Sequence, residues 1–392
     1  MGEKQKRLSK PINGVSAGND ILDARGAQES SRWSWRIRRE PSTSCGAAVR
    51  VKPRARLCEG NNIVDAPTNL CHNPSMMNEQ NFPKTLLEAV KYFADADNAL
   101  AFMVQIRWPE GITCPYCEAG DPMFITTRRV WKCKACRKQF RAKVGTIFED
   151  SPIGLDKWFP ALWMIVNMKN GISSYELGKA LGVTQKTAWF MNHRLRKAMQ
   201  TGTFRKLAGD VEIDETFIGG KARFMHKSKR ATFGSTGFVG KVAVMGLLER
   251  DGEVRCQVVP NTRRKNLEGV IRKHIETGAN VYSDNLPSYR SLDDAEYIHK
   301  VIDHAREYVN GHVHTNGIEN FWSLLKRSIK GTYVSVEPFH LFRYLDEQSF
   351  RFNTRKATDA DRFIQASLAI TGKRLTFDKL TGKEPAGYET SH

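Results

Sequence analysis

The chain has 392 residues, of which 40% are apolar, and its formal net charge is +19 at pH 7. This length exceeds one compact domain, so the chain should divide into two or three. The charge indicates a polyanionic partner, usually nucleic acid, and the lack of any run of ~20 apolar residues excludes a membrane-spanning helix.

The first 77 residues differ in composition from the rest of the chain. They mix Arg, Ser, Gly and Pro without a sustained apolar period, so residues 1–77 are expected to form a disordered basic extension. The alternative is that translation starts at Met76 or Met77. The basic N-terminus has no apolar stretch behind it, so we expect no secretory signal and a reducing, cytoplasmic location.

Residues 78–150 combine a helical lead-in with a cysteine-rich module. Two C-x-x-C pairs, Cys114 with Cys117 and Cys133 with Cys136, are separated by fifteen residues. This separation is typical of a zinc site in which each pair offers two thiolates to one tetrahedral ion. Short strand patterns bearing Arg and Lys accompany the pairs, which indicates a zinc ribbon. Because four cysteines close the coordination shell, we expect the zinc to be structural.

Residues 151–205 have the pattern of a helix-turn-helix. Gly182 ends one predicted helix in a tight turn, and Thr184 caps the next. The second helix carries polar and basic side chains suited to base edges and phosphates. The residues expected to contact DNA are Lys186, Thr187, Asn192, Arg194 and Arg196. The alternative is an ordinary helical hairpin with a solvated basic face.

Residues 206–357 contain three acids at the ends of predicted elements. Asp214 lies near the end of one strand pattern, Asp284 ends a second, and Glu319 lies near the start of a helix. Enzymes that cut phosphodiester bonds with two metal ions need carboxylates that converge from separate elements and hold the ions about 4 Å apart. Asp284 and Glu319 are 35 positions apart, and Lys326 follows Glu319 by two helical turns. These residues are candidates for a metal-dependent catalytic site.

Some of these acids also have structural interpretations. Asn316 and Glu319, three positions apart, fit a helix capping box that serves only backbone N–H groups. Asp210 and Glu212 share one strand face with Asp214, so a neighbour could take its place. Trp322 and Phe321 are expected in the core.

Six segments of the chain together form a pattern that is specific for one protein family, although each acid alone would mean little. They are RWPEGITCPYC, CKACRKQF, VEIDETFIGG, VYSDN, HTNGIENFWSLLKR and FHLFRYLDEQSFRFN. They resemble the DDE transposases of bacterial insertion sequences, and the resemblance covers about Phe82 to Lys356. It implies a multidomain α/β fold, with an RNase H-like mixed sheet and helices preceded by a zinc ribbon and a small helical helix-turn-helix domain. Residues 358–392 remain as a C-terminal tail.

For the site, the resemblance implies that Asp214, Asp284 and Glu319 hold two Mg²⁺ (or Mn²⁺) ions, in addition to the structural Zn²⁺. Lys326 is then the basic residue that follows the last acid. Some members of the family use Asn in place of that acid, so Asn316 competes with Glu319 as the third ligand.

The activity that this resemblance implies is DNA transposition. The protein would bind the terminal inverted repeats of its element, hydrolyse the strand at each end and transfer the 3′-hydroxyl to target DNA. Its partners would be double-stranded DNA and further copies of itself in a synaptic complex at the nucleoid, with no membrane. The alternatives are a domesticated, non-catalytic DNA-binding regulator and a related metal-dependent nuclease.

Overall fold

The computed structural model describes residues 82–200, 205–220, 240–289, 292, 296–302 and 314–383. The expected extension over residues 1–77 lies outside these ranges. In the part of the chain that the structure describes, no helix combines the length and apolar character needed to cross a membrane.

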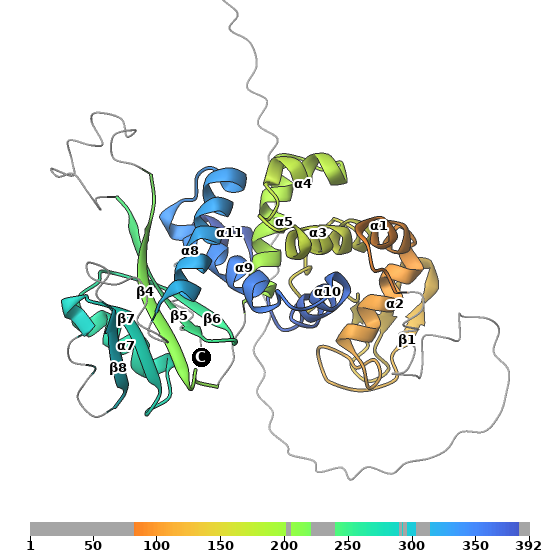
Figure 1. Cartoon of the computed structure of the whole chain (residues 1–392). Helices are drawn as coiled ribbons and strands as arrows, with labels where there is room; N and C mark the ends of the chain where they lie inside the picture. The colour runs from red at the N-terminus through yellow and green to blue at the C-terminus, as the bar shows by residue number, and fades with distance from the viewer. Residues whose placement is uncertain are drawn as a thin grey trace, which may run out of the picture. The chain divides into compact units, whose positions relative to one another are not determined.

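Two short helices precede the cysteine module (Figure 1). α1 (Leu86–Ala94) and α2 (Ala96–Arg107) are separated by Asp95, whose carboxylate accepts hydrogen bonds from two N–H groups at the start of α2. Such a cap satisfies N–H groups that have no partner within the helix. The cysteine module that follows forms a three-stranded antiparallel sheet in the order β1-β2-β3. The bounds are β1 (Met123–Ile125), η2 (Thr126–Arg128), β2 (Val130–Lys132) and β3 (Gln139–Phe140).

A helical bundle follows the ribbon. Its central helix, α3 (Leu155–Asn167), buries every residue from Trp158 to Val166. The predicted helix-turn-helix is present as α4 (Ser174–Leu181) and α5 (Gln185–Ala198). Gly182 between them has φ of 61°, a left-handed conformation that costs glycine no steric strain.

The segment 358–392, expected as a C-terminal tail, contributes a helix to this bundle. α10 (Asp359–Leu368) packs against α3, where Phe363 and Ala366 are fully buried. The ring of Phe363 lies 5.6 Å from that of Phe93 in α1. The composition of this segment is mixed because only one face of α10 is apolar, and that face completes the core.

The remaining strands form one mixed sheet in the order β6-β5-β4-β7-β8. The strands are β4 (Asp210–Ile218), β5 (Val242–Glu249), β6 (Val254–Val259), β7 (Asn280–Asp284) and β8 (Ile298–Ile302). β4, β5 and β6 pair antiparallel, whereas β7 runs parallel to β4 and β8 runs parallel to β7. This is the mixed sheet of the RNase H fold, so the predicted fold class is confirmed.

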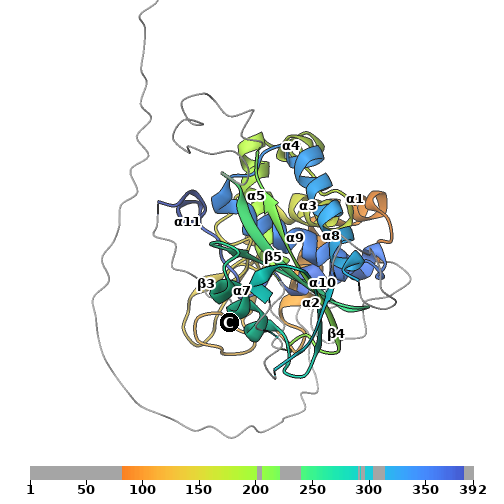
Figure 2. The same ribbon diagram turned by 60° about the vertical axis from the view of Figure 1, so that its left-hand side comes forward.

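The two faces of the sheet pack against different helices (Figures 1 and 2). On β4, Val211 and Ile213 face the core formed with α7 (Arg264–His274). Ile218 and the other even positions face the core formed with α8 (Asn316–Ser328). The period of two along a strand thus assigns Asp214 to the α8 face.

The other elements connect these parts. They are η4 (Pro287–Tyr289), η5 (Ile329–Tyr333), η6 (Pro338–His340), α9 (Leu341–Asn353) and α11 (Phe377–Thr381). α9 contacts β6 and α8 of the sheet domain and α3 and α5 of the helical bundle.

Candidate functional site

The four cysteines of the ribbon meet at one point. All four sulfur atoms lie within 4.8 Å of one another, with Cys114 Sγ 3.6 Å from Cys136 Sγ and Cys117 Sγ 3.5 Å from Cys133 Sγ. The backbone N–H of Cys136 donates to Cys133 Sγ; this bond, with further hydrogen bonds from Cys117 and Cys136, lowers the pKa of the Cys133 thiol to about 6 against the effect of burial. The cluster offers the four soft ligands of a tetrahedral structural zinc ion, and these residues fit that ion.

The two aspartates are neighbours on the mixed sheet. β4 and β7 run parallel with Glu212 opposite Tyr282, so the register brings Asp214 beside Asp284 two residues further on. Asp284 is the last residue of β7. Its position at the carboxyl end of a parallel strand is one at which ligand sites commonly form in open α/β sheets.

α8 brings Glu319 to the same place. Trp322, three residues after Glu319, donates a hydrogen bond from Nε1 to Asp214 Oδ2 at 2.9 Å. Because a helix turns about 100° per residue, Glu319 and Lys326 both lie within ~60° of Trp322 around the helix axis, on the stripe that faces Asp214.

Asn316 lies farther from this stripe, ~120° from Trp322 around α8 by the same geometry. The capping box considered for Asn316 and Glu319 requires Asn316 as N-cap, but α8 begins at Asn316 and its N-cap is Thr315. Thr315 Oγ1 instead lies 3.4 Å from Glu319 Oε1 and donates to it. The helix geometry therefore favours Glu319 as the residue nearest the aspartates.

The acids influence one another electrostatically. Burial, followed by the negative charge of Asp284, raises the pKa of Asp214 to about 6, and Glu319 adds to this rise. Hydrogen bonds from the Glu215 N–H and from Trp322 oppose it. Burial, and then the charges of Asp214 and Asp284, raise the pKa of Glu215 to about 8. Like charges gathered in this way favour a bound cation, which would relieve their repulsion.

The three carboxylates are spaced more widely than the cysteines. In the described ranges, the cysteine cluster is the only group of three or more His, Cys, Asp or Glu residues whose ligand atoms lie within 4.8 Å of one another. The carboxylates are hard oxygen donors, which is the donor type that Mg²⁺ and Mn²⁺ prefer, so Asp214, Asp284 and Glu319 fit those ions chemically.

The acids next to Asp214 on the strand have other partners. Glu212 is 1% exposed and accepts hydrogen bonds from Arg250 Nε at 3.0 Å and from the Ile318 N–H at 2.9 Å. Asp210 Oδ1 accepts from Asn280 Nδ2 at 2.8 Å. These contacts show structural roles for the two neighbours and leave Asp214 as the strand acid that meets Asp284.

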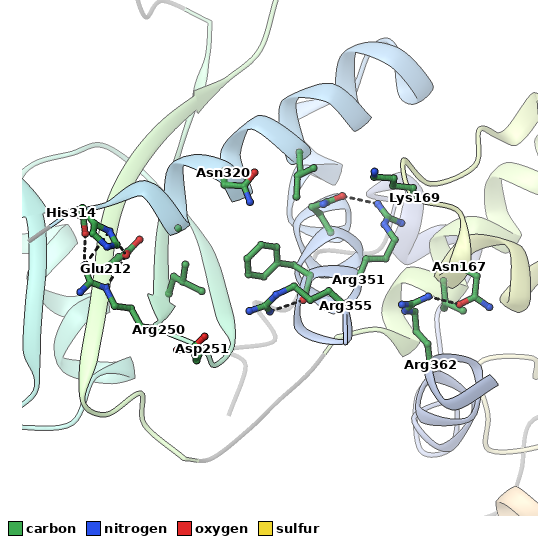
Figure 3. A pocket seen from close by; sticks show the side chains of 16 residues that line it. Asn167, Lys169, Glu212, Arg250, Asp251, His314, Asn320, Arg351, Arg355 and Arg362 are labelled. Atoms are coloured by element: carbon green, nitrogen blue, oxygen red, sulfur yellow. Dashed lines mark hydrogen bonds and ion pairs between the residues drawn. The ribbon is translucent and has the colours of Figure 1, made fainter. Parts of the chain in front are cut away.

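A cavity of about 700 Å³ lies on the side of α8 that faces away from Asp214. Figure 3 shows Glu212, Arg250 and His314 at one end and Lys169, Arg351 and Arg362 at the other. Gly317, Asn320 and Leu324 of α8 line it, and none of the three candidate metal ligands does. α8 therefore separates the cavity from the acid cluster.

The predicted DNA-reading helix divides into two parts. Lys186 is exposed and Thr187 is partly exposed in the first turn of α5, where the Thr184 side chain caps the helix. These two residues are accessible to a ligand.

The three later residues of α5 that were expected to contact DNA are buried. Asn192, Arg194 and Arg196 are only 1%, 5% and 1% exposed. Asn192 donates to a backbone carbonyl, Arg194 donates to two, and Arg196 Nε pairs with Glu347 Oε2 at 2.6 Å. Because this half of α5 packs against α9 and α3, these three side chains are buried in contacts within the bundle.

Two residues near the acids were not singled out as functional from the sequence. The sequence predicts Trp322 only as a core residue, and no sequence pattern indicates a role for Gly246. Gly246 is the cross-strand partner of Asp214, and the Trp322 ring fills the space above it. The three-residue spacing between Glu319 and Trp322 was an available signal, but the role of Gly246 depends on strand register.

The chain is similar to known transposase families. A family model described as the ISXO2-like transposase domain matches residues 206–353, and one described as the transposase zinc-ribbon domain matches residues 94–139. The matched ranges contain the acids and all four cysteines, respectively.

Two relatives carry related descriptions. An "uncharacterized protein in transposable element ISH50" of Halobacterium salinarum is 30% identical over 252 residues, covering 61% of this chain and 84% of that protein. An "uncharacterized transposase-like protein" of Haemophilus influenzae is 35% identical over 101 residues, covering 26% of this chain and 81% of that protein.

Among solved structures, a chain of the simian T-cell lymphotropic virus intasome, in complex with the PP2A regulatory subunit B56 gamma, aligns with a TM-score of 0.24 and 13% identity. The alignment covers 48% of this chain and 65% of that chain. This similarity is too low to carry an argument about the site.

Proposed function

The chain belongs to the ISXO2-like family of insertion-sequence transposases, and from that premise we propose that it cleaves and joins DNA at the ends of its own element. In this proposal the protein binds the terminal inverted repeats and hydrolyses a phosphodiester bond at each end. The freed 3′-hydroxyl then attacks target DNA. Both steps are displacements at phosphorus, so one group of carboxylates can serve both, without a covalent protein–DNA intermediate.

One observation carries this proposal. Asp214 and Asp284 are neighbours on one face of the sheet, and the charge of Glu319 reaches them from α8. These acids come from three separate elements, which is the arrangement required to surround metal ions from several sides. A chain that only bound DNA would have no need for three mutually repelling carboxylates in a partly buried position.

Each residue has a proposed role. Mg²⁺ (or Mn²⁺) ions held by Asp214, Asp284 and Glu319 would polarise the scissile phosphodiester and lower the pKa of the attacking hydroxyl. The two aspartates are held by a rigid sheet, and this fixes the position of their oxygens before DNA arrives. Lys326 lies on the same face of α8 as Glu319, and we propose that it binds a phosphate oxygen of the DNA backbone.

The zinc ribbon and the start of α5 supply accessible groups for DNA binding. Lys186 and Thr187 are suited to contact DNA at the N-terminus of α5, the end of a recognition helix that meets base edges. The ribbon adds exposed cations suited to phosphates, namely Arg128, Lys134, Arg137, Lys138 and Arg141. Two element ends must be held together for transposition, so we propose that the protein acts as a homo-oligomer.

Strand-transfer assays test the proposal. The full-length protein is mixed with labelled terminal-repeat DNA, a target plasmid and Mg²⁺. Gel electrophoresis then distinguishes DNA that has only been cleaved from DNA that has been joined to the target. Joined products support transposition. Cleavage without joining would replace the proposal with a nuclease, and binding without either reaction would replace it with a regulator.

Variants of the acids identify the site within the same assay. Asp284→Ala and Glu319→Gln should each reduce cleavage by at least about 10³-fold, because each removes several kcal/mol of charge stabilisation. DNA binding measured by mobility shift should persist. Asn316→Ala is the matched control on the same turn of α8, and a larger loss for Asn316→Ala than for Glu319→Gln would make Asn316 the third ligand.

A further inference from the structure

The position opposite Asp214 on the neighbouring strand has no side chain. Asp214 and Gly246 are direct cross-strand partners on β4 and β5. A Cβ atom at position 246 would lie 2.5 Å from Cζ2 and 2.7 Å from Cη2 of Trp322. A Cβ atom essentially never lies this close to an atom to which it is not bonded, so the indole of Trp322 occupies the space that any other residue at 246 would need.

The indole is oriented by its hydrogen bond as well as by its packing. Trp322 is 3% exposed and donates from Nε1 to Asp214 Oδ2 at 2.9 Å, while the backbone N–H of Glu215 donates to Oδ1 at 2.8 Å. Each oxygen of the carboxylate therefore receives one donor, and the plane of the group is fixed. Each oxygen keeps a further lone pair that can bind a cation.

Tryptophan is suited to this role by its chemistry. Its N–H is a donor only, so the ring can orient a carboxylate but cannot accept a proton from it or compete with it for a metal ion. Hydrogen bonds to metal-binding carboxylates fix their orientation, and their loss typically lowers metal affinity or activity by ~10–100-fold.

Resting on the proposed function, we infer that Trp322, seated over Gly246, is a positioning residue that orients Asp214 for divalent-ion binding. Trp322 follows Glu319 by less than one turn of α8. Docking of this one helix thus delivers a candidate ligand and also orients the ligand opposite it. A core tryptophan could satisfy its N–H with any acceptor, but this one bonds to the first acid of the site.

The test compares Mn²⁺ binding by the zinc-loaded, full-length protein and its Trp322→Phe variant, measured by titration calorimetry without DNA. Phenylalanine keeps an aromatic ring in the pocket and removes the donor. Mn²⁺ affinity should fall by ~10–100-fold, and the metal concentration for half-maximal cleavage should rise by a similar factor. An unchanged Mn²⁺ affinity in a folded Trp322→Phe protein overturns the inference.

Trp158→Phe is the matched control. Trp158 is 1% exposed, and its Nε1 donates to Ser151 Oγ at 3.2 Å in the helical bundle. It loses the same atoms and one hydrogen bond, but its Mn²⁺ affinity should equal that of the wild type. Equal losses in the two variants would mean that destabilisation, and not orientation of Asp214, explains the effect.

Gly246→Ala tests the contact between Trp322 and Asp214 by a change on the neighbouring strand, β5. The added methyl group displaces the indole without altering Trp322, so it should weaken Mn²⁺ binding if the inference holds, even where Trp322→Phe fails to fold. Wild-type affinity in Gly246→Ala contradicts the inference. If the wild type itself neither binds Mn²⁺ nor cleaves DNA, the proposed function fails, and this outcome is distinct from a failure confined to the variants.

Discussion

Glu212 on β4 accepts a hydrogen bond at 2.9 Å from the backbone N–H of Ile318, the third residue of α8. The N-cap of this helix, Thr315, makes no side-chain cap hydrogen bond. The carboxylate of Glu212 therefore provides the capping interaction from another element, and its charge is also favourable at a helix N-terminus. Because β4 also carries Asp214, the bond fixes the start of α8 relative to the first acid.

Glu212→Gln should lower both stability and cleavage. The substitution removes the charge that pairs with Arg250 at 3.0 Å and with the α8 N-terminus in a site where Glu212 is 1% exposed. Breaking such a buried ionic contact costs about 3 kcal/mol or more. We expect a lower midpoint of thermal unfolding, and a loss of Mg²⁺-dependent cleavage larger than the loss of DNA binding.

Glu249→Gln provides the control for this effect. Glu249 pairs with Arg205, whose side chain is 61% exposed, and exposed pairs contribute about 1 kcal/mol or less. The control should retain nearly the wild-type midpoint and cleavage rate. Equal effects of the two substitutions would remove Glu212 from the positioning of α8.

The candidate residues of this site could be predicted from the sequence, but most of the contacts between them could not. Asp214, Asp284 and Glu319 could be proposed from the sequence because each lies at a recognisable place in a strand or helix pattern. The hydrogen bond that the Ile318 N–H donates to Glu212 spans 106 residues, and no local pattern encodes a contact of that kind. The role of Gly246 could not be predicted either, because it depends on the register between β4 and β5.

The helix α5 should respond differently to substitutions at its two ends. Lys186→Ala removes an exposed cation, so DNA binding should weaken and its salt dependence should decrease by about one counterion, with unchanged unfolding. Arg196→Ala leaves the buried Glu347 with one cation fewer, and it should cost about 3–5 kcal/mol of stability. Salt-dependent binding titrations and thermal unfolding of both variants separate the two roles.

If Arg196→Ala unfolded at the wild-type midpoint but bound DNA more weakly, the sequence-based assignment of Arg196 to DNA binding would be supported. The sequence-based assignment assumed that basic residues late in a recognition helix face phosphates. Here the partner of Arg196 is 151 residues away on α9. Periodicity identified the helix correctly but did not identify which of its faces α9 covers.

Cys133→Ser should release zinc and unfold the ribbon. Cys133 is 1% exposed, and its sulfur is one of the four that lie within 4.8 Å of one another. A structural zinc site contributes directly to folding, so the variant should contain about one zinc ion fewer per chain by elemental analysis. Cys256→Ser, a cysteine on β6 outside the cluster, is the control and should keep its zinc. Normal zinc content in Cys133→Ser would contradict the four-thiolate site.

Stabilisation of the protein by Mg²⁺ should increase with pH. The pKa of Asp214 is raised from 3.8 to about 6 and that of Glu215 from 4.5 to about 8. The folded protein therefore binds more protons than the unfolded chain between about pH 4 and 8, so without metal the free energy of unfolding falls as pH rises through this window. Mg²⁺ supplies the positive charge that the protons provided. The rise in unfolding midpoint caused by saturating Mg²⁺ should be larger at pH 8 than at pH 5.

Asp284→Asn tests the cause of this pH dependence. It removes the charge that, after burial, contributes most to the raised pKa of Asp214. The variant should lose less stability than the wild type between pH 5 and pH 8 without metal, because its remaining carboxyls ionise more easily. It should also lose most of the Mg²⁺ response, because a candidate ligand is gone. A Mg²⁺ response in the wild type that is equal at both pH values would mean that protons and Mg²⁺ do not compete for these carboxylates, and a response retained in Asp284→Asn would place the bound ion elsewhere.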